Sequence, residues 1–444
     1  MPDNKLGTNV LLDRAAQAVE LCRAAGADDC VAAASRSRSV EFTTRNGSLE
    51  KVQESTSRSL ELRIYVDGRY SAHSTTDLRP EMLQSFIADA VALTRALQPD
   101  PFRVIPDPKL YEHRPEVDLQ LLDAGLAELT QARREELCKA MDAAARAHEK
   151  AISASSTVQD GHSELAAVSS NGFSGTAAEG DVWMVTEVTL KDEGDRRPEA
   201  WDYMGARRLA DMADPAVIGG NALRRALARL GAVKGPTGKH TLVIEPRAAG
   251  MLVGALLGPA NARSIQQSQS FWAGRLGQAL ASDKLTVIDD PLLVGGFASR
   301  LFDNEGISSR RLPILEAGVA RNVYVDTYYG KKAGMEPTTG SSSNRVITLG
   351  TLDLDGLMAQ VGDGILVTNW LGGNSDPTTG DFSFGMEGHL IRGGRRDASV
   401  SEMVATGNLM DLFKALVAVG NDPWRYSSTL VPTLVFEGVQ VSGG

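Results

Sequence analysis

The chain has 444 residues, of which 42% are hydrophobic and 23% charged, and this predicts a soluble globular protein of about two to three domains. Its net charge of −10 argues against a nucleic-acid partner, and its longest apolar stretch, 248–257, is far shorter than the roughly 20 residues that a membrane-spanning helix needs. The odd number of cysteines (Cys22, Cys30 and Cys138) and the absence of a signal region in residues 1–7 predict reduced thiols in the cytoplasm and no membrane partner.

The first part of the chain predicts a helix–sheet–helix unit, assigned to an N-terminal α+β domain over residues 1–98. Apolar residues recur at helical spacing over 9–25 and again over 80–97. Between them, alternating or β-branched residues predict four strands. These strands are expected at 29–35, 39–44, 48–55 and 59–66, with tight hairpin turns at Asn46-Gly47 and Asp67-Gly68.

A proline-rich segment, 99–117, follows and is expected to be an extended linker, because proline lacks a backbone donor and blocks helix formation. Residues 118–234 are then predicted to form a middle α+β domain with the same order of elements. Its elements are expected as helices at 118–148 and 214–230 and strands at 152–159, 164–169 and 181–190, with a turn at Asn171-Gly172.

The remainder, 235–444, begins with Gly-Pro-Thr-Gly and is glycine-rich. A strand at 240–244 and a helix at 246–257 are followed by short strands at 345–349, 364–370, 389–392 and 430–437. Short strands separated by glycine turns predict a β-rich C-terminal domain with a curved or barrel-like sheet. The predicted fold class is therefore α+β throughout.

The histidines provide no recognisable zinc site. No two of the six lie closer than 14 positions, whereas a helical zinc motif places two imidazoles one to one and a half turns apart. The carboxylates Asp303, Glu305 and Asp381 offer another possibility, because carboxylate clusters hold divalent cations. Solvated turns with capping aspartates are the alternative interpretation.

Several ordered motifs occupy the second half of the chain. They are Asp-Asp-Pro at 289–291, Gly-Gly-Phe-Ala-Ser at 295–299, Phe-Asp-Asn-Glu-Gly at 302–306, Asn-Trp-Leu-Gly-Gly-Asn at 369–374, Thr-Thr-Gly-Asp-Phe-Ser at 378–383, Gly-Asn-Leu at 407–409 and Val-Gly-Asn-Asp at 419–422. In order and spacing they resemble the TldD/PmbA family. The resemblance covers nearly the whole chain and is strongest from about residue 240 onward.

This family resemblance implies a zinc motif that the chain does not have. TldD subunits carry a His-Glu-x-x-x-His helix and a later cysteine. In the matching helix, Gly254 and Pro259 replace the two histidines and Ala255 replaces the glutamate, and no cysteine follows Asp422. Since these side chains offer no donor atom, no catalytic residue and no metal ligand is expected in this chain. The departure matches the TldE (PmbA) branch of the family.

The resemblance therefore implies a non-catalytic TldE-like subunit that pairs with a TldD-like zinc peptidase subunit. Such a complex would form a chamber for the proteolysis or maturation of small unfolded peptides. No cofactor is expected in this chain, and zinc is expected in the partner. Two alternatives stay open: a stand-alone homodimer that binds peptides, and an independent hydrolase with a carboxylate-held metal.

The glycine-rich segment 371–385 is the candidate surface for a peptide or a partner. Glycine allows close backbone approach, so an extended peptide can add there as a strand, while a plain hairpin turn is the alternative. The candidate residues are Gly372, Gly373, Asn374, Thr379, Gly380 and Asp381.

Overall fold

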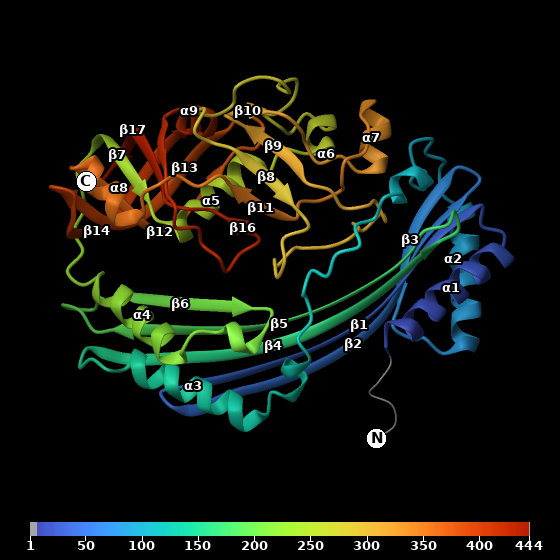
Figure 1. The fold of residues 1–444 in the computed structure, drawn as a ribbon, viewed down its shortest axis with the longest axis horizontal. Helices are drawn as coiled ribbons and strands as arrows, with labels where there is room; N and C mark the ends of the chain where they lie inside the picture. The colour runs from blue at the N-terminus through green and yellow to red at the C-terminus, as the bar shows by residue number, and fades with distance from the viewer. Residues whose placement is uncertain (1–6, 444) are drawn as a thin grey trace.

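The structure is a computed structural model that describes residues 7–443, so residues 1–6, where no signal region is expected, lie outside it. Figure 1 shows a long curved sheet with helices near both of its ends and a C-terminal β-rich domain lying across it. Within the described range, no helix is long and apolar enough to cross a membrane. The predicted α+β class is confirmed.

The first half of the chain consists of two successive helix–sheet–helix units. The elements are α1 Thr8–Ala24, β1 Asp29–Arg45, β2 Ser48–Val66, β3 Arg69–Thr75, α2 Pro80–Arg95, α3 Gln131–Ala145, β4 Ala151–Ser169, β5 Ser174–Leu190, β6 Glu199–Ala206 and α4 Pro215–Leu227, with 3₁₀ helices at Pro108–Tyr111, Ala124–Glu128 and Leu209–Asp211.

The strands of both units form one antiparallel sheet in the order β3-β2-β1-β4-β5-β6. Its centre is the pairing of β1 with β4, which runs from Val31↔Ser169 to Arg45↔Ser155. Helices α1 and α2 cover one end of this sheet, and α3 and α4 cover the other (Figure 1). The two units therefore share a continuous sheet, although each keeps its own helices.

Several predicted boundaries are wrong. The strands β1, β2 and β4 were each expected as two shorter strands, because serine and charged residues interrupt their apolar alternation. The backbone nevertheless pairs continuously, since ladder hydrogen bonds do not depend on side-chain polarity. Helix α3 is shorter than the predicted 118–148, because the Thr130 side chain caps it by accepting from the backbone N–H of Arg133 at 3.2 Å. The turns at Asn46-Gly47, Asp67-Gly68 and Asn171-Gly172 are confirmed.

The second half forms the C-terminal domain. Its elements are β7 Gly238–Ile244, α5 Pro246–Leu257, α6 Ala262–Gln266, β8 Val287–Asp290, β9 Leu312–Glu316, β10 Val319–Ala320, α7 Thr327–Ala333, β11 Asn344–Ile347, α8 Leu354–Val361, β12 Gly364–Ser375, β13 Asp381–Arg392, β14 Arg395–Asn408, α9 Leu409–Lys414, β15 Leu416–Val419, β16 Thr429–Leu430 and β17 Leu434–Ser442.

A closed barrel forms the main sheet of this domain. Its strands follow the order β14-β13-β12-β7-β17, and pairing of β14 with β17 closes the ring, while β15 adds to β17. Strands β10, β9, β8, β11 and β16 form a separate five-stranded sheet. The predicted barrel-like sheet is thus confirmed, and helix α5 packs into the large apolar core of this domain.

Two arginines fasten the long sheet to the C-terminal domain. Arg207, at the end of β6, is buried and donates to the carbonyl oxygens of Gly296 and Phe297 at 3.1 and 2.9 Å. Arg247, in the first turn of α5, pairs with Asp202 of β6 at 2.8 Å and lies over the ring of Trp201, with its carbon Cζ 4.1 Å from the ring centroid. These contacts hold the long sheet and the C-terminal domain in position on the two sides of the candidate site.

Candidate functional site

Helix α5 and the residues just after it hold Gly254, Ala255 and Pro259, the positions that the sequence resemblance implies for metal ligands and base. The core-facing side chains of the helix are apolar, including Leu252 and Leu256, which are buried. Gly254 and Ala255 lie on the partly exposed side, and Pro259 is buried just beyond the helix. A Cβ atom at Gly254 would meet no other heavy atom within 4 Å, so space is available there but no donor is. These three residues therefore do not fit a zinc ion.

The rest of the described chain, residues 7–443, contains no group of three or more His, Cys, Asp or Glu side chains placed to hold a metal ion. Cys22 of α1 and Cys30 of β1 are buried in the core between α1, α2 and the long sheet, and Cys138 of α3 is buried against the same sheet. All three are free thiols in the N-terminal half, so none can complete a site at α5.

The carboxylates that were considered as an alternative metal site are occupied by hydrogen bonds from the chain. Asp303 accepts from the backbone N–H groups of Ile307 and Gly340, each at 3.0 Å. Glu305 accepts from the backbone N–H and the hydroxyl of Thr327, and burial raises its pKa above the ordinary range. These contacts favour a structural role in shaping loops.

The glycine-rich candidate residues lie in the β12–β13 hairpin. Gly372, Gly373 and Asn374 are exposed residues of β12 and pair with β13, while Thr379 and Gly380 form the turn. Asp381 accepts hydrogen bonds from the Thr379 hydroxyl and from the Asn408 amide at 2.9 and 3.0 Å. The two groups of residues thus share one hairpin and are exposed except for the buried Gly380, and Asn408, the capping residue of α9, hydrogen-bonds to the turn.

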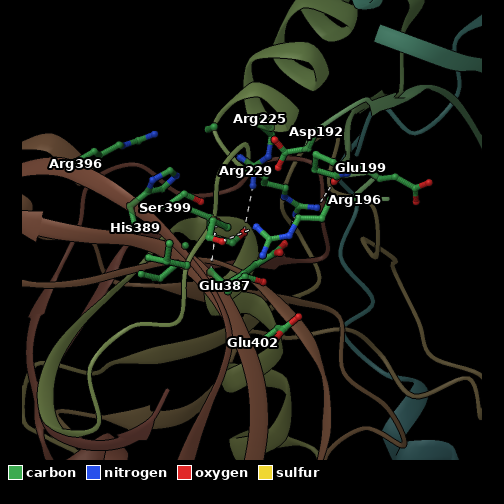
Figure 2. A pocket seen from close by; sticks show the side chains of 18 of the residues that line it. Asp192, Arg196, Glu199, Arg225, Arg229, Glu387, His389, Arg396, Ser399 and Glu402 are labelled. Carbon is green, nitrogen blue, oxygen red and sulfur yellow. Dashed lines mark hydrogen bonds and ion pairs between the residues drawn. The ribbon is translucent and has the colours of Figure 1, made fainter. Parts of the chain in front are cut away.

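A pocket that the sequence did not predict lies between the two halves of the molecule (Figure 2). Its volume is about 760 Å³, and its walls come from α4, the β5–β6 connection, residues 232–234 and barrel strands β12, β13 and β14. Ligand sites commonly occupy such interfaces between structural units. The pocket is therefore a cavity in which this chain could hold a ligand.

Two ion pairs form the floor of the pocket. Arg225 of α4 pairs with the buried Glu245 and also donates to the Thr368 carbonyl oxygen at 3.2 Å. Arg229, one turn further along the chain, pairs with Glu387 of β13, which is 9% exposed. Burial lowers the pKa of Arg229 from its ordinary value, and the guanidinium nonetheless remains charged at neutral pH. These pairs join the middle of the chain to the barrel.

His389 lies two residues from Glu387 on β13 and is 9% exposed. Burial, assisted by the positive charge of Arg396, lowers its pKa below the ordinary value. Neutral imidazole is therefore the dominant form at pH 7, where His389 adds no charge to the pocket. Figure 2 shows it beside Arg396 and Ser399, on the barrel side of the cavity.

Five further cations line the pocket without a carboxylate within ion-pair distance among residues 7–443. They are Arg196, Arg197, Arg224, Lys234 and Arg396. The sequence concealed this grouping, because its members come from four separate segments that only the fold brings together.

Comparison with protein-family models gives three matches in chain order. The first domain of PmbA/TldA metallopeptidases matches residues 30–94, the central domain matches 124–230, and the C-terminal domain matches 237–443. The pocket lies between the segments matched by the second and third of these models.

Individual relatives agree with these matches. The Metalloprotease PmbA of Escherichia coli O157:H7 is 26% identical over 448 residues, covering 98% of this chain and 96% of the relative. A Bacteroides thetaiotaomicron crystal structure, described as that of a modulator of DNA gyrase, is 38% identical with a TM-score of 0.94 and covers 97% of this chain and 98% of that one. TldE from Thermococcus kodakarensis is 20% identical with a TM-score of 0.86, covering 97% and 100% of the two chains, a similarity of fold.

Proposed function

Because this chain belongs to the PmbA/TldD family of metallopeptidases, we propose that it is the non-catalytic, TldE-like subunit of a cytoplasmic zinc peptidase. The metal would be held by a TldD-like partner chain, and the two would enclose a chamber for the proteolysis or maturation of small unfolded peptides. The family relatives named metalloproteases support peptide-bond hydrolysis as the activity of the whole complex.

The composition of α5 is the observation that carries this proposal. A catalytic zinc ion needs about three protein ligands and a base that helps to deprotonate its water. Gly254, Ala255 and Pro259 supply neither, although the space beside Gly254 is open. The helix has kept its packing role in the barrel core without the chemistry that the family motif provides elsewhere.

A free sheet edge supports the presence of a partner chain. Residues 48–59 of β2 pair only with β1, since β3 begins to pair at Leu60, and the eleven residues 48–58 are all exposed. Leu49 and Val52 lie opposite the buried Thr44 and Phe42, so both apolar side chains share one face, at 56% and 47% exposure. Long unpaired edges readily pair with another chain.

The charges of this edge do not prevent such pairing. Glu50, Lys51 and Glu54 are each ion-paired with a residue of β1, at 2.8, 3.0 and 2.8 Å. Their partners are Arg45, Glu41 and Arg38, so the pairs are neutral as units. Among the charged residues of this edge, Arg58 alone forms no ion pair within the described residues, so the edge carries little of the uncompensated charge that commonly keeps edge strands apart.

We expect the double substitution Leu49→Lys/Val52→Lys to weaken association with the TldD-like partner at least tenfold, because it places two unpaired charges on the apolar face of the edge. Sedimentation velocity of the mixed chains measures this association. Leu93→Lys/Leu97→Lys is the matched control, since these exposed leucines lie on α2 and just after its C-terminal cap, away from the edge. Equal weakening of association by the two double substitutions would show that the edge of β2 is not part of the interface.

The peptidase itself provides the decisive experiment. The purified chain should contain no stoichiometric zinc and should cleave no unfolded peptide, whereas mixing with a TldD-like chain from the same cells should give hydrolysis that a chelator abolishes. Metal analysis and a fluorogenic peptide assay measure the two results. Chelator-sensitive hydrolysis by the chain alone would overturn the proposal in favour of an independent hydrolase. Peptide binding by a homodimer that co-purifies with no TldD-like chain would overturn it in favour of a stand-alone binding protein.

A further inference from the structure

We propose that the pocket between α4 and the barrel is an anion-binding site that receives carboxylate groups of an extended peptide. This identification of the ligand as a peptide rests on the peptidase-subunit function proposed above. The cavity volume of about 760 Å³ lies within the range of about 300–1,000 Å³ that is usual for ligand sites. It can therefore hold several atoms of a side chain or chain end beyond a single ion.

The charge of the lining carries the proposal. Seven cationic side chains and five carboxylates line the pocket, an excess of two positive charges in a chain whose net charge is −10. A positive concavity on an otherwise negative molecule concentrates anions locally, because field lines are focused in a cleft with low-dielectric walls. The net charge of the pocket lining is thus opposite in sign to the net charge of the whole chain.

The pairing of these charges shows which of them are available to a ligand. Glu245 and Glu387 already balance Arg225 and Arg229 on the floor, so these four groups carry no net charge. Among the remaining cations, Arg196 and Arg224 donate only to neutral oxygens, those of the Ala232 carbonyl and the Asn221 amide. A carboxylate entering the pocket would therefore meet five cations without an ion pair among the described residues, against three further lining carboxylates, those of Asp192, Glu199 and Glu402.

The backbone beneath two of the free cations is held firmly. Val233 donates its N–H to the Ser399 carbonyl oxygen and accepts from the N–H of Ser401, each at 3.0 Å, which places Lys234 against β14. Arg396 lies at the start of β14, paired with Ile391. The backbone at both residues is therefore held at β14. Binding of a ligand would have to order only the two side chains, which limits its entropic cost.

The five unpaired cations are all exposed, so ion pairs with them would be partly screened by solvent and would strengthen at low salt. Deeper in the pocket the floor carboxylates Glu245 and Glu387 are buried, whereas the side chains of Arg225 and Arg229 are 25% and 23% exposed. The lowered pKa of the floor residue Arg229 agrees with reduced solvation at this depth. Geometry and charge together favour an acidic peptide over a neutral one.

The test uses the purified full chain without a partner. A fluorescently labelled, end-blocked peptide with two adjacent glutamates should bind at least tenfold more tightly than the same peptide with glutamines, as measured by anisotropy at low salt. The variant Lys234→Ser/Arg396→Ser should abolish most of this preference. The control Lys239→Ser/Arg392→Ser removes the same charge from exposed residues on β7 and β13 that do not line the pocket.

Equal weakening by the two double variants, or equal affinity for the two peptides, would overturn the proposal. Displacement of the peptide by inorganic phosphate at concentrations below the peptide's own dissociation constant would also overturn the proposal. The pocket would then be a site for free phosphate. Because the assay needs no TldD-like chain, its failure is distinguishable from failure of the subunit proposal, which co-purification and the peptidase assay report separately.

Discussion

Replacement of Arg134 by alanine is expected to lower the free energy of unfolding by about 3–5 kcal/mol, because it leaves a buried carboxylate without its counter-charge. Arg134 of α3 donates from Nε and Nη2 to the two carboxylate oxygens of Asp160 on β4, at 2.5 and 2.9 Å. The two residues are only 4% and 3% exposed. Urea denaturation followed by circular dichroism measures the loss.

The neighbouring residue supplies a matched control. Arg133 pairs with Glu136 at 2.6 Å, but both side chains are largely exposed, so Arg133→Ala should change the stability by no more than about 0.5 kcal/mol. The double variant Arg134→Leu/Asp160→Leu should recover most of the loss, since it leaves no charge behind. Similar effects of Arg133→Ala and Arg134→Ala would contradict the burial argument.

Features of the fold that depend on neighbouring residues could be predicted from the sequence, whereas pairings between distant strands could not. The hairpin turns at Asn46-Gly47, Asp67-Gly68 and Asn171-Gly172 were predictable, because each turn depends on the conformational tolerance of two adjacent residues. The union of the two units into one sheet was not, because the pairing of Val31 with Ser169 joins residues far apart in the chain. No periodicity within a strand indicates which distant strand lies beside it.

The candidate site also has one part that the sequence could predict and one part that it could not. The absence of donor side chains at Gly254, Ala255 and Pro259 could be recognised from one short segment, because a metal motif is a local pattern of donors. The pocket could not, because Arg229 and Glu387 approach each other only when α4 packs against the barrel. A charged pocket between two structural units is a property of their arrangement, and neither segment alone shows it.

The composition of α5 bears on how the proposed non-catalytic subunit keeps the fold of its family. Helix α5 lacks every donor of the family motif and still buries Leu252, Leu256 and Leu257 in the barrel core. Burial of these side chains stabilises the fold whether or not the helix carries metal ligands, so the proposed non-catalytic subunit can keep the family fold. Whatever binding it contributes must then come from surfaces away from the motif, such as the pocket beside Glu387.

Replacement of Gly388 by alanine is the second prediction with a large expected effect. A Cβ at this position would lie 1.8 Å from the carbonyl oxygen of Leu366 and 3.1 Å from the Cα of Val367, which are backbone atoms of the neighbouring strand β12. Backbone atoms cannot rotate away, so β12 and β13 would have to separate locally. We expect a loss of about 3 kcal/mol in the free energy of unfolding, at the upper end of the usual cost of overpacking.

The same substitution at Gly254 separates this clash from the general effect of removing a glycine. Gly254 lies inside α5, where a Cβ meets no heavy atom within 4 Å, so Gly254→Ala should stabilise the protein by about 0.5–1 kcal/mol through its higher helix propensity. Chemical denaturation of the two variants in parallel should therefore give shifts of opposite sign. Stabilisation by Gly388→Ala would mean that the strands around the pocket floor are more pliable than their close backbone approach implies.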